Sequence, residues 1–353
     1  MTRLPGPAER SSAAKPTDPV QTTTLGRSGL QVSRLALGTW EFSGAWGDVD
    51  EEKAVAIVRR ARDLGFNFFD TAHEYGFGTA ERILGTALRH ELDHARDEVV
   101  IATKGGLRET DDGPVRDARP EWLRHDVDTS LAALGIDHID LYQVHWPDPA
   151  VPAAETAGAL ADLVAAGKIR HVGVSNYDAG QIAEFAATLP VETVQPPFNM
   201  LRRELQDTLF PYCRDNDIGV LVYGALAHGL LTGTVTAESR FAADDWRALS
   251  GIFSGEGFAR NLEVVERLRL LAADLGVTLS QLALAWALAQ PGVHVAIVGA
   301  QHVGYLQDSA AAVHLELTST ELAAIAEILA SSSPVSGPYP EMWKEFADRE
   351  TRD

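Results

Sequence analysis

The chain has 353 residues, 45% of them hydrophobic, which is enough material for one large α/β barrel. It carries 30 Lys and Arg against 50 Asp and Glu, and the net charge of −20 argues against nucleic acid as a partner, because phosphate backbones attract basic proteins. No apolar run reaches the roughly 18 residues of a membrane-spanning helix, and the single cysteine, Cys213, excludes an intrachain disulfide, so we expect a cytoplasmic protein without a membrane partner and with Cys213 packed in a helix.

The segment before the first predicted core strand has two parts. Residues 1–20 are rich in Pro, Ala and Ser and lack the apolar centre of a secretion signal, so they are predicted to be a disordered leader. Residues 22–32 are predicted to form a hairpin that plugs the bottom of a barrel.

Eight short segments, rich in β-branched and aromatic residues, are predicted as strands. Apolar residues on both faces are typical of buried parallel strands. The segments are residues 32–38, 66–72, 99–104, 138–145, 171–176, 193–199, 219–226 and 294–300.

Helical patterns lie between these strands. The clearest cover residues 50–65, 119–135, 154–168 and 261–276; the first opens with acidic residues, which suit a helix N-terminus, and closes at Gly65. The alternation predicts an α/β fold, a closed (β/α)8 TIM-type barrel over residues 21–330 as a single domain, with an open doubly wound sheet as the alternative.

Two segments do not follow the alternation. Residues 227–260 form a long polar connection after the seventh strand, and residues 331–353 form a loop-like C-terminal tail that contains Trp343. Long loops at the carboxyl ends of barrel strands usually build the substrate pocket, so both segments are candidates for its walls.

Polar residues gather at the carboxyl ends of the predicted strands, where barrel enzymes place their active sites. Each alone has a structural explanation: a cap for an Asp, a solvated Lys, a core His. Taken together they indicate a site. In chain order they are Asp70, Tyr75, Lys104, His145, Asn176, Gln195 and Tyr223.

The motifs around these residues resemble those of the aldo-keto reductase family, in the same order along the chain. The matching segments are FFDTAHEYGFGTAERILG (68–85), IATK (101–104), LYQVHWPD (141–148), GKIRHVGVSN (167–176), QPPFN (195–199) and YGALAHGLLTG (223–233). The resemblance implies an oxidoreductase that transfers hydride between a nicotinamide cofactor, NAD(P)(H), and a small aldehyde, ketone or sugar-like alcohol.

The resemblance also implies a catalytic group made of Asp70, Tyr75, Lys104 and His145. Tyr75 would act as the general acid or base at the carbonyl oxygen. A phenol has a pKa near 10, and the Lys104 ammonium is expected to lower that value, with Asp70 holding the lysine in place. His145 would hydrogen-bond the substrate carbonyl.

The cofactor contacts are implied by the same resemblance, because the chain has no strand–GxGxxG–helix fingerprint. Ser175, Asn176 and Gln195 would bind the carboxamide, Tyr223 would stack on the nicotinamide ring, and the loop after it would wrap the pyrophosphate. The complete expected set is Gly38, Thr39, Trp40, Asp70, Ser175, Asn176, Gln195, Tyr223, Gly224, Ala225, Leu226, Leu231, Gly299, Gln301, Tyr305, Asp308 and Ser309.

The adenosine end departs from the family pattern. Gln301 and Tyr305 stand where basic residues commonly bind the 2′-phosphate of NADP, and Thr234 stands where a Lys is common. Without a cation a phosphate loses charge-assisted hydrogen bonds, so NAD or dual use is favoured over the family's usual NADP. Arg240 or Arg247 remains a candidate to reach the phosphate.

The substrate pocket is expected to include Trp40, Tyr75, Phe77, His145 and Trp146. No metal is predicted, because the His and Asp residues lack metal-ligand spacing. Two other functions stay open: a nicotinamide-binding regulatory subunit like the potassium-channel β subunits, and a barrel lyase or hydrolase. The sequence gives no oligomeric state.

Overall fold

The computed structural model describes residues 19–111, 113–242, 245–248 and 250–335. Most of the predicted leader, and Trp343 with most of the predicted tail, lie outside these residues. Val20, at the end of the predicted leader, is buried, and its N–H donates to the carbonyl of Leu64 at 3.0 Å. Val20 therefore packs against the barrel domain, although the sequence places it in the leader.

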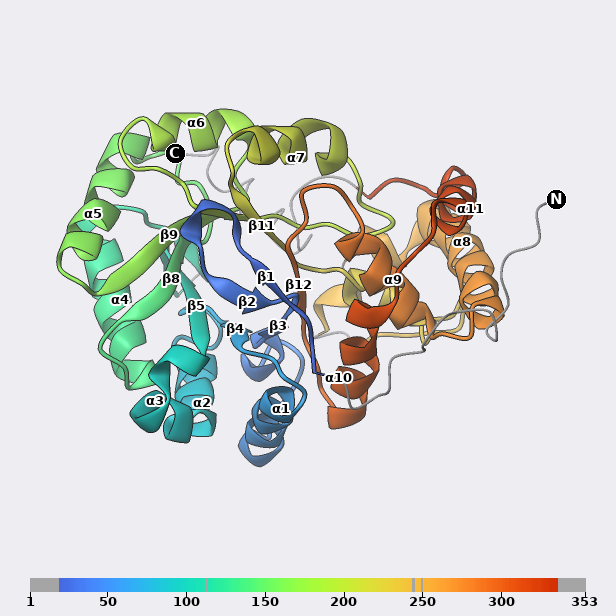
Figure 1. Ribbon diagram of the computed structural model, residues 1–353, viewed down its shortest axis with the longest axis horizontal. Coiled ribbons are helices and arrows are strands. Elements are labelled where there is room, and N and C mark those ends of the chain that lie inside the picture. The colour runs from blue at the N-terminus through green and yellow to red at the C-terminus, as the bar shows by residue number, and fades with distance from the viewer. Residues whose placement is uncertain (1–18, 112, 243–244, 249, 336–353) are drawn as a thin grey trace.

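Eight parallel strands close into a barrel, which confirms the predicted fold and excludes the open sheet (Figure 1). They pair in chain order, and pairing of Val298 with Leu37 closes the ring. The strands are β3 (Leu35–Gly38), β4 (Phe68–Asp70), β5 (Val100–Gly105), β8 (Ile139–Val144), β9 (Ile169–Ser175), β10 (Thr193–Gln195), β11 (Gly219–Val222) and β12 (Val295–Val298).

The predicted hairpin closes the amino-terminal end of the barrel, where β1 (Thr22–Thr24) pairs with β2 (Gln31–Ser33), and Figure 1 shows it crossing the strands in blue. Leu25 and Val32 join the apolar barrel interior with Phe68. Gly219 lets the hairpin approach closely, since a Cβ there would lie 2.8 Å from the Leu25 side chain. The plug leaves only the carboxyl end open.

Helices surround the barrel. Helix α1 illustrates how the sequence determines these helices. Asp50 caps its N-terminus by accepting a hydrogen bond from Lys53 N–H. Ile57, Val58 and Ala61 lie on the face that packs against the core. The helices are α1 (Glu51–Asp63), α2 (Thr79–Ala87), α3 (Arg89–His94), α4 (Pro120–Leu134), α5 (Ala153–Ala165), α6 (Ala179–Ala186), α7 (Leu205–Asp215), α8 (Gly255–Asp274), α9 (Leu279–Leu288), α10 (Val303–Ala310) and α11 (Ser319–Leu329). Cys213 is buried in α7 as predicted, and burial raises the pKa of its thiol to about 12.

The connection at residues 227–260 is more ordered than predicted. It contains three 3₁₀ turns, and α8 begins at Gly255 rather than near residue 261. Its core side chains include Leu230, Leu231 and Phe253, so it packs as part of the barrel wall. Short 3₁₀ turns and one further strand pair complete the fold: η2 (Gly26–Ser28), η3 (Trp40–Phe42), η4 (Arg96–Glu98), η5 (Ala227–Thr232), η6 (Trp246–Ala248), η7 (Gly251–Phe253), η8 (Ala311–His314), β6 (Leu107–Arg108) and β7 (Val115–Arg116).

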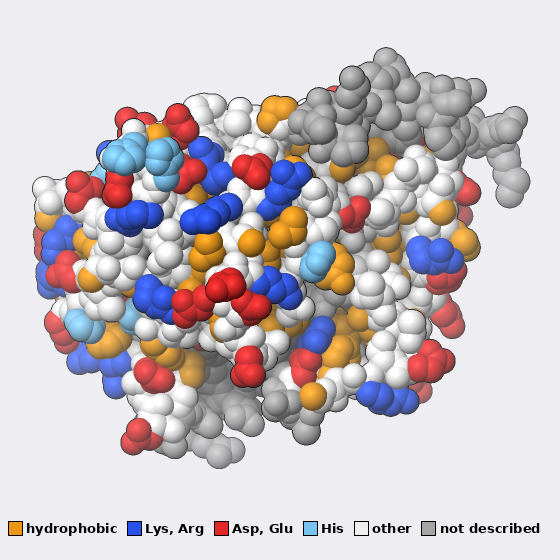
Figure 2. Space-filling view, turned by 90° about the horizontal axis from the view of Figure 1, so that it is seen from below, with side chains coloured by type: hydrophobic (Ala, Val, Ile, Leu, Met, Phe, Trp, Pro, Cys, Tyr) orange, Lys and Arg blue, Asp and Glu red, His pale blue; other side chains and the backbone are white. Residues whose placement is uncertain are grey.

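Acidic and basic side chains lie among one another on the face shown in Figure 2. In the described ranges, no single helix is long and apolar enough to cross a membrane. Helices α8 and α9 reach that length and composition only as a pair bent by 93°.

Candidate active site

One pocket of about 820 Å³ opens at the carboxyl ends of the barrel strands. That volume lies in the range of ligand sites, roughly 300–1,000 Å³. Most of the predicted residues line it: Gly38, Thr39, Trp40, Asp70, Tyr75, Phe77, His145, Trp146, Ser175, Asn176, Gln195, Tyr223, Gly224, Ala225, Leu226, Gly299, Gln301, Tyr305, Asp308 and Ser309. Lys104 and Leu231 do not line it.

Lys104 lies behind the pocket wall, fully buried at the end of β5. Its Nζ donates to Oδ1 of Asp70 at 2.6 Å, to the carbonyl of Thr71 at 2.8 Å and to the Tyr75 hydroxyl at 3.4 Å. The other Asp70 oxygen accepts from Gln195 at 2.7 Å. Strand ends β4, β5 and β10 thus fix one buried ion pair with the phenol next to it.

The Tyr75 phenol does not have the lowered pKa expected from the sequence. Its pKa lies well above the ordinary value, because burial disfavours the phenolate and the carboxylates of Asp70 and Glu74 add to that effect. The prediction failed because burial disfavours the phenolate more strongly than the Lys104 ammonium favours it. Tyr75 therefore holds its proton at neutral pH.

His145 follows β8 beside the phenol, and the two rings meet edge-to-face with centroids 5.9 Å apart. Burial, and then the Lys104 charge, hold the pKa of His145 well below its usual value, so the imidazole is neutral near pH 7. Its Nδ1 is buried and has no hydrogen-bond partner among the described residues. A neutral ring can donate one hydrogen bond and accept another.

Three side chains on the adjoining strand ends form a network. The Tyr223 hydroxyl donates to Oδ1 of Asn176 at 2.7 Å, and the Asn176 amide donates to the His145 carbonyl at 3.0 Å. Asn176 adopts a positive φ of 63°, an uncommon conformation that places its side chain across this corner. Ser175 donates to the Gln195 carbonyl at 2.8 Å. Tyr223 is thereby fixed as a pocket wall.

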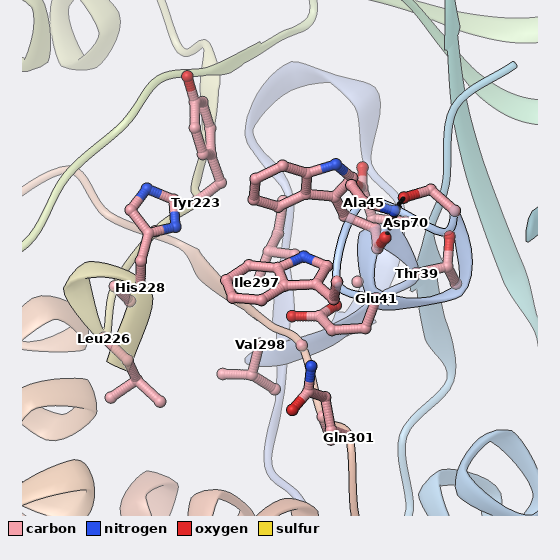
Figure 3. A pocket seen from close by; sticks show the side chains of 18 of the residues that line it. Thr39, Glu41, Ala45, Asp70, Tyr223, Leu226, His228, Ile297, Val298 and Gln301 are labelled. Atoms are coloured by element: carbon pink, nitrogen blue, oxygen red, sulfur yellow. Dashed lines mark hydrogen bonds between the residues drawn. The ribbon is translucent and has the colours of Figure 1, made fainter. Parts of the chain in front are cut away.

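Opposite walls of the pocket differ in character. Figure 3 shows Tyr223 and His228 on one side, and Thr39, Glu41 and Asp70 across from them. Thr39 Oγ1 is buried and has no hydrogen-bond partner in the described part of the chain. Together with Nδ1 of His145, it gives the pocket polar atoms for a ligand to satisfy.

The loop after β11 has a strained backbone. Ala227 and His228 both have positive φ, 48° and 53°, which side-chain-bearing residues rarely adopt. The N–H groups of Ala227 and Gly229 donate to the carbonyls of Gly224 and Leu226, at 2.9 and 3.1 Å, and these hydrogen bonds hold the loop in this conformation. Leu231, expected to touch cofactor, is instead fully buried in the core, and its N–H donates to the Leu226 carbonyl.

The far end of the pocket carries few cations. Asp308 accepts from Thr278 at 2.9 Å and from Gln281 at 2.8 Å, while Tyr305 is 64% exposed. Among the described residues that line the pocket, Arg247 is the only Lys or Arg. Arg240, the other candidate, donates to nearby backbone carbonyls and does not line the pocket.

Arg247 belongs to the 227–260 segment and contacts aromatic rings at the pocket. Its guanidinium lies 5.0 Å from the centre of the Trp46 ring and 4.5 Å from that of Phe241, and it pairs with Asp245 at 2.6 Å. It therefore ties this segment to the chain that follows β3.

Sequence reasoning missed several lining residues: Glu41, Trp46, Glu74 and His228. The Glu41 carboxyl lies against Gly299, where a Cβ would come within 1.8 Å of it. Burial raises the pKa of Glu41 to about 7, and burial likewise raises the pKa of Glu74 to about 7. His228 lies inside the motif at residues 223–233, and Glu41 directly follows Trp40, which was predicted to line the pocket. Nearness to predicted site residues could therefore have pointed to both.

No group of three or more His, Cys, Asp and Glu residues in the described ranges is arranged to hold a metal ion. The pocket's ion pair, neutral imidazole and protonated phenol instead match acid–base chemistry on an organic ligand.

The family model for the aldo/keto reductase family matches residues 34–330. The chain belongs to the aldo/keto reductase family. It is 42% identical over 287 residues to the aldo-keto reductase YhdN of Bacillus subtilis, covering 81% of this chain and 86% of that protein. This family membership agrees with the motif order found in the sequence.

Two further relatives widen the comparison. An NADH-specific methylglyoxal reductase of Escherichia coli is 34% identical over 320 residues, which is 86% of this chain and 97% of that enzyme. Among solved structures, a glycerol dehydrogenase from Gluconobacter oxydans superposes with a TM-score of 0.81 and 34% identity, over 92% of this chain and 98% of that one. Members of the family act on small carbonyl compounds, so this chain is an oxidoreductase of that kind.

Proposed function

We propose that this aldo-keto reductase uses NAD(P)(H) to interconvert a small carbonyl compound and its alcohol, with Tyr75 as the proton donor. The observation that carries the proposal is the contact of Lys104 with both Asp70, at 2.6 Å, and the Tyr75 hydroxyl, at 3.4 Å, beside a neutral His145. A bound nicotinamide supplies the hydride, which no side chain can do.

The residues of this chain have separable roles. Tyr75 holds a proton at the pocket surface and gives it to the oxygen of the reduced carbonyl. Lys104 stabilises the phenolate left behind, and Asp70 keeps the lysine in position. The imidazole of His145 is neutral, and its Nδ1 atom has no hydrogen-bond partner among the described residues. The ring can therefore hydrogen-bond and orient the carbonyl oxygen.

The pocket fits a dinucleotide along its length. Tyr223 offers a flat face for a nicotinamide ring, Ser175, Asn176 and Gln195 offer polar partners for its amide, and the loop after β11 lines the same pocket where the pyrophosphate would lie. Thr39 and His145 have polar atoms that a ligand would satisfy.

The proposed preference is NAD(H) over NADP(H). Gln301 and Tyr305 are uncharged, and Asp308 adds an acidic side chain to the same end of the pocket. Among the described residues that line the pocket, Arg247 is the one cation that a 2′-phosphate could meet, and its charge is already paired with Asp245. The E. coli relative named as NADH-specific agrees with this preference.

The proposed substrates are small dicarbonyl compounds and polyols, as the names of the methylglyoxal reductase and glycerol dehydrogenase relatives suggest. The pocket supports a small substrate, because the bulky rings of Trp40, Trp46 and Trp146 line it together with Tyr75.

A cofactor titration followed by a substrate screen tests the function. NADH and NADPH are titrated by protein fluorescence, and the absorbance of the reduced nicotinamide is then followed with methylglyoxal, glycerol and larger carbonyl compounds. The proposal expects binding and steady turnover. Tight binding without turnover on any carbonyl would favour the regulatory-subunit function instead.

A further inference from the structure

His73 lies behind the pocket between two buried carboxylates that the proposed chemistry does not use. Its Nδ1 lies 3.8 Å from Oε2 of Glu81, and its Nε2 lies 3.6 Å from Oδ1 of Asp126. His73 is 7% exposed, and both carboxylates are fully buried. Two buried carboxylates without a nearby cation are costly, so His73 is the group that can balance them.

Each carboxylate holds the strand that carries Lys104. The Thr103 hydroxyl donates to Oε1 of Glu81 at 2.6 Å, and the Gly106 N–H donates to Oδ2 of Asp126 at 2.7 Å. Lys104 therefore lies between two points at which β5 and its continuation are fixed to the cluster.

Gly105 shows how closely the cluster packs on that strand. A Cβ at this position would lie 1.9 Å from the Tyr142 hydroxyl and 2.5 Å from Oδ2 of Asp126. The residue next to Lys104 is thus in direct contact with the cluster.

His73 is also part of the loop that carries Tyr75. Its N–H donates to the Lys104 carbonyl at 3.0 Å, and its carbonyl accepts from Gly78 N–H at 2.9 Å. Its ring meets Phe77, a pocket residue, edge-to-face at 5.9 Å. One residue therefore connects the acidic cluster, the Lys104 strand and the Tyr75 loop.

Four buried polar atoms in and beside the cluster of His73, Glu81 and Asp126 form no hydrogen bond among the described residues. His73 Nδ1, Glu81 Oε2, Asp126 Oδ1 and the Tyr142 hydroxyl have no hydrogen-bond partner in the part of the chain that the structure describes. Burial lowers the pKa of His73, but Glu81, Asp126 and Glu74 outweigh it, and the net pKa is raised. Burial raises the pKa of Asp126 to about 7, against the opposing effect of His73 and with Glu81 and Asp117 adding to the rise.

We propose that His73 is a positioning residue, whose imidazolium between Glu81 and Asp126 holds the Tyr75 loop against the Lys104 strand. The inference rests on the proposed function, because it assumes that Tyr75 and Lys104 perform the proton transfer. The Tyr75–Lys104 contact of 3.4 Å is long for a hydrogen bond, so a small shift of the loop breaks it. His73, Glu81 and Asp126 do not line the pocket, so the effect belongs to kcat and not to cofactor affinity.

The test first removes the positive charge of His73 and then removes one of the two negative charges that it balances. His73→Gln leaves both carboxylates without their cation, and at about pH 8 its kcat is expected to fall roughly tenfold or more, since small misplacements of catalytic groups carry costs of this size. At about pH 6 the loss is smaller, because Asp126 then holds a proton. Adding Asp126→Asn to His73→Gln removes one carboxylate, and the double variant is expected to recover to within about threefold of wild type with a flat pH response.

Controls separate this effect from general damage. His171→Gln breaks another imidazole–carboxylate pair, the partly exposed one with Glu192 on the barrel wall, and is expected to leave kcat unchanged. Cofactor Kd from fluorescence should be the same in all variants. A kcat for His73→Gln within twofold of wild type at both pH values would overturn the proposal, as would a loss that Asp126→Asn does not rescue.

If His73→Gln does not fold, the test compares the double variant with Asp126→Asn alone. Both variants are expected to fold and to have similar kcat values. An inactive double variant would contradict the proposal. Tyr75→Phe is measured in parallel. Full activity of Tyr75→Phe would reject the proposed function itself, whatever the His73 variants do.

Discussion

The state of the Tyr75 proton follows from burial and charge balance at single residues. A nearby lysine lowers a phenol's pKa, but burial of Tyr75 outweighs that effect, and the Asp70 carboxylate, which pairs with Lys104 at 2.6 Å, raises the pKa further. The phenol is left protonated, which suits a group that gives up a proton during carbonyl reduction. Burial, which the sequence does not show, decides this point.

The raised pKa of Tyr75 makes the two reaction directions differ in pH dependence. Alcohol oxidation needs the phenolate as base, and below its pKa the phenolate fraction grows roughly tenfold per pH unit. We expect kcat/KM for alcohol oxidation to rise steeply with pH up to the alkaline limit of the protein, and kcat/KM for carbonyl reduction to stay nearly flat from about pH 6 to 8. Initial rates in both directions across that range measure this. A flat oxidation profile would contradict a buried phenol as the base.

Cofactor preference is also decided by single side chains. Gln301→Arg places a guanidinium at the adenosine end of the pocket, and we expect the ratio of kcat/KM for NADPH to that for NADH to rise by about tenfold, the effect of one charge-assisted contact of roughly 1.5 kcal/mol. Gln307→Arg is the matched control, because it adds the same charge to an exposed position of α10 that does not line the pocket. If both variants shift the ratio equally, Gln301 is not at the phosphate position.

Strand β5 is the element that couples the fold to the site, because it carries Lys104 and ends in the tightly enclosed Gly105. Gly105→Ala forces a methyl group to within 1.9 Å of the Tyr142 hydroxyl, and overpacking of this kind typically costs 1–3 kcal/mol. We expect a lower midpoint of thermal unfolding and a lower kcat together.

Gly158→Ala in α5 is the control for that variant, since a Cβ there meets nothing within 4 Å. A glycine inside a helix is destabilising by roughly 0.5–1 kcal/mol relative to alanine, so this variant should be slightly more stable than wild type. Equal midpoints for the two variants would show that Gly105 is not tightly enclosed.

The strands and their order could be predicted because buried parallel strands leave a plain pattern, apolar runs followed by polar residues such as Asp70 and His145. Helix α9 shows the limit: Leu282 to Leu288 are all buried, so the amphipathic period that marks a surface helix is missing. The motifs predicted the candidate catalytic group, and the structure brings Asp70, Tyr75 and Lys104 into contact, with His145 beside the phenol. Glu41 lines the pocket although the sequence did not single it out, and Leu231 is buried in the core, because only the packing shows which side chains reach the pocket.

At the scale of the molecule, buried acids make stability depend on pH in an unusual direction. Glu74 has a folded-state pKa of about 7 against an ordinary value of 4.5, so the folded protein keeps a proton that the unfolded chain loses between these values. Its contribution to the unfolding free energy therefore declines as pH rises from about 4.5 to 7. Lowered histidine pKa values, such as that of His228, act oppositely below about 6.5.

The effect of Glu74 can be separated from that of the other titratable groups by comparing the unfolding free energies of wild type and Glu74→Gln. We expect Glu74→Gln to gain stability relative to wild type as pH rises from about 5 to 8, because the variant lacks the carboxylate that burial penalises. Urea unfolding of both proteins at the two pH values gives the difference. A gap that narrows in favour of wild type at the higher pH would contradict the raised pKa.

At the scale of the whole molecule, a hairpin closes one end of the barrel, and the protonated phenol of Tyr75 lines the pocket at the other end. Single-turnover reduction of a carbonyl compound by Tyr75→Phe, with cofactor affinity measured on the same sample, tests this most directly. Removing the proton donor while keeping the ring should leave the cofactor Kd unchanged and slow the chemical step by roughly 10²–10⁴-fold, the usual contribution of general acid catalysis. A chemical step as fast as in the wild-type enzyme would contradict it.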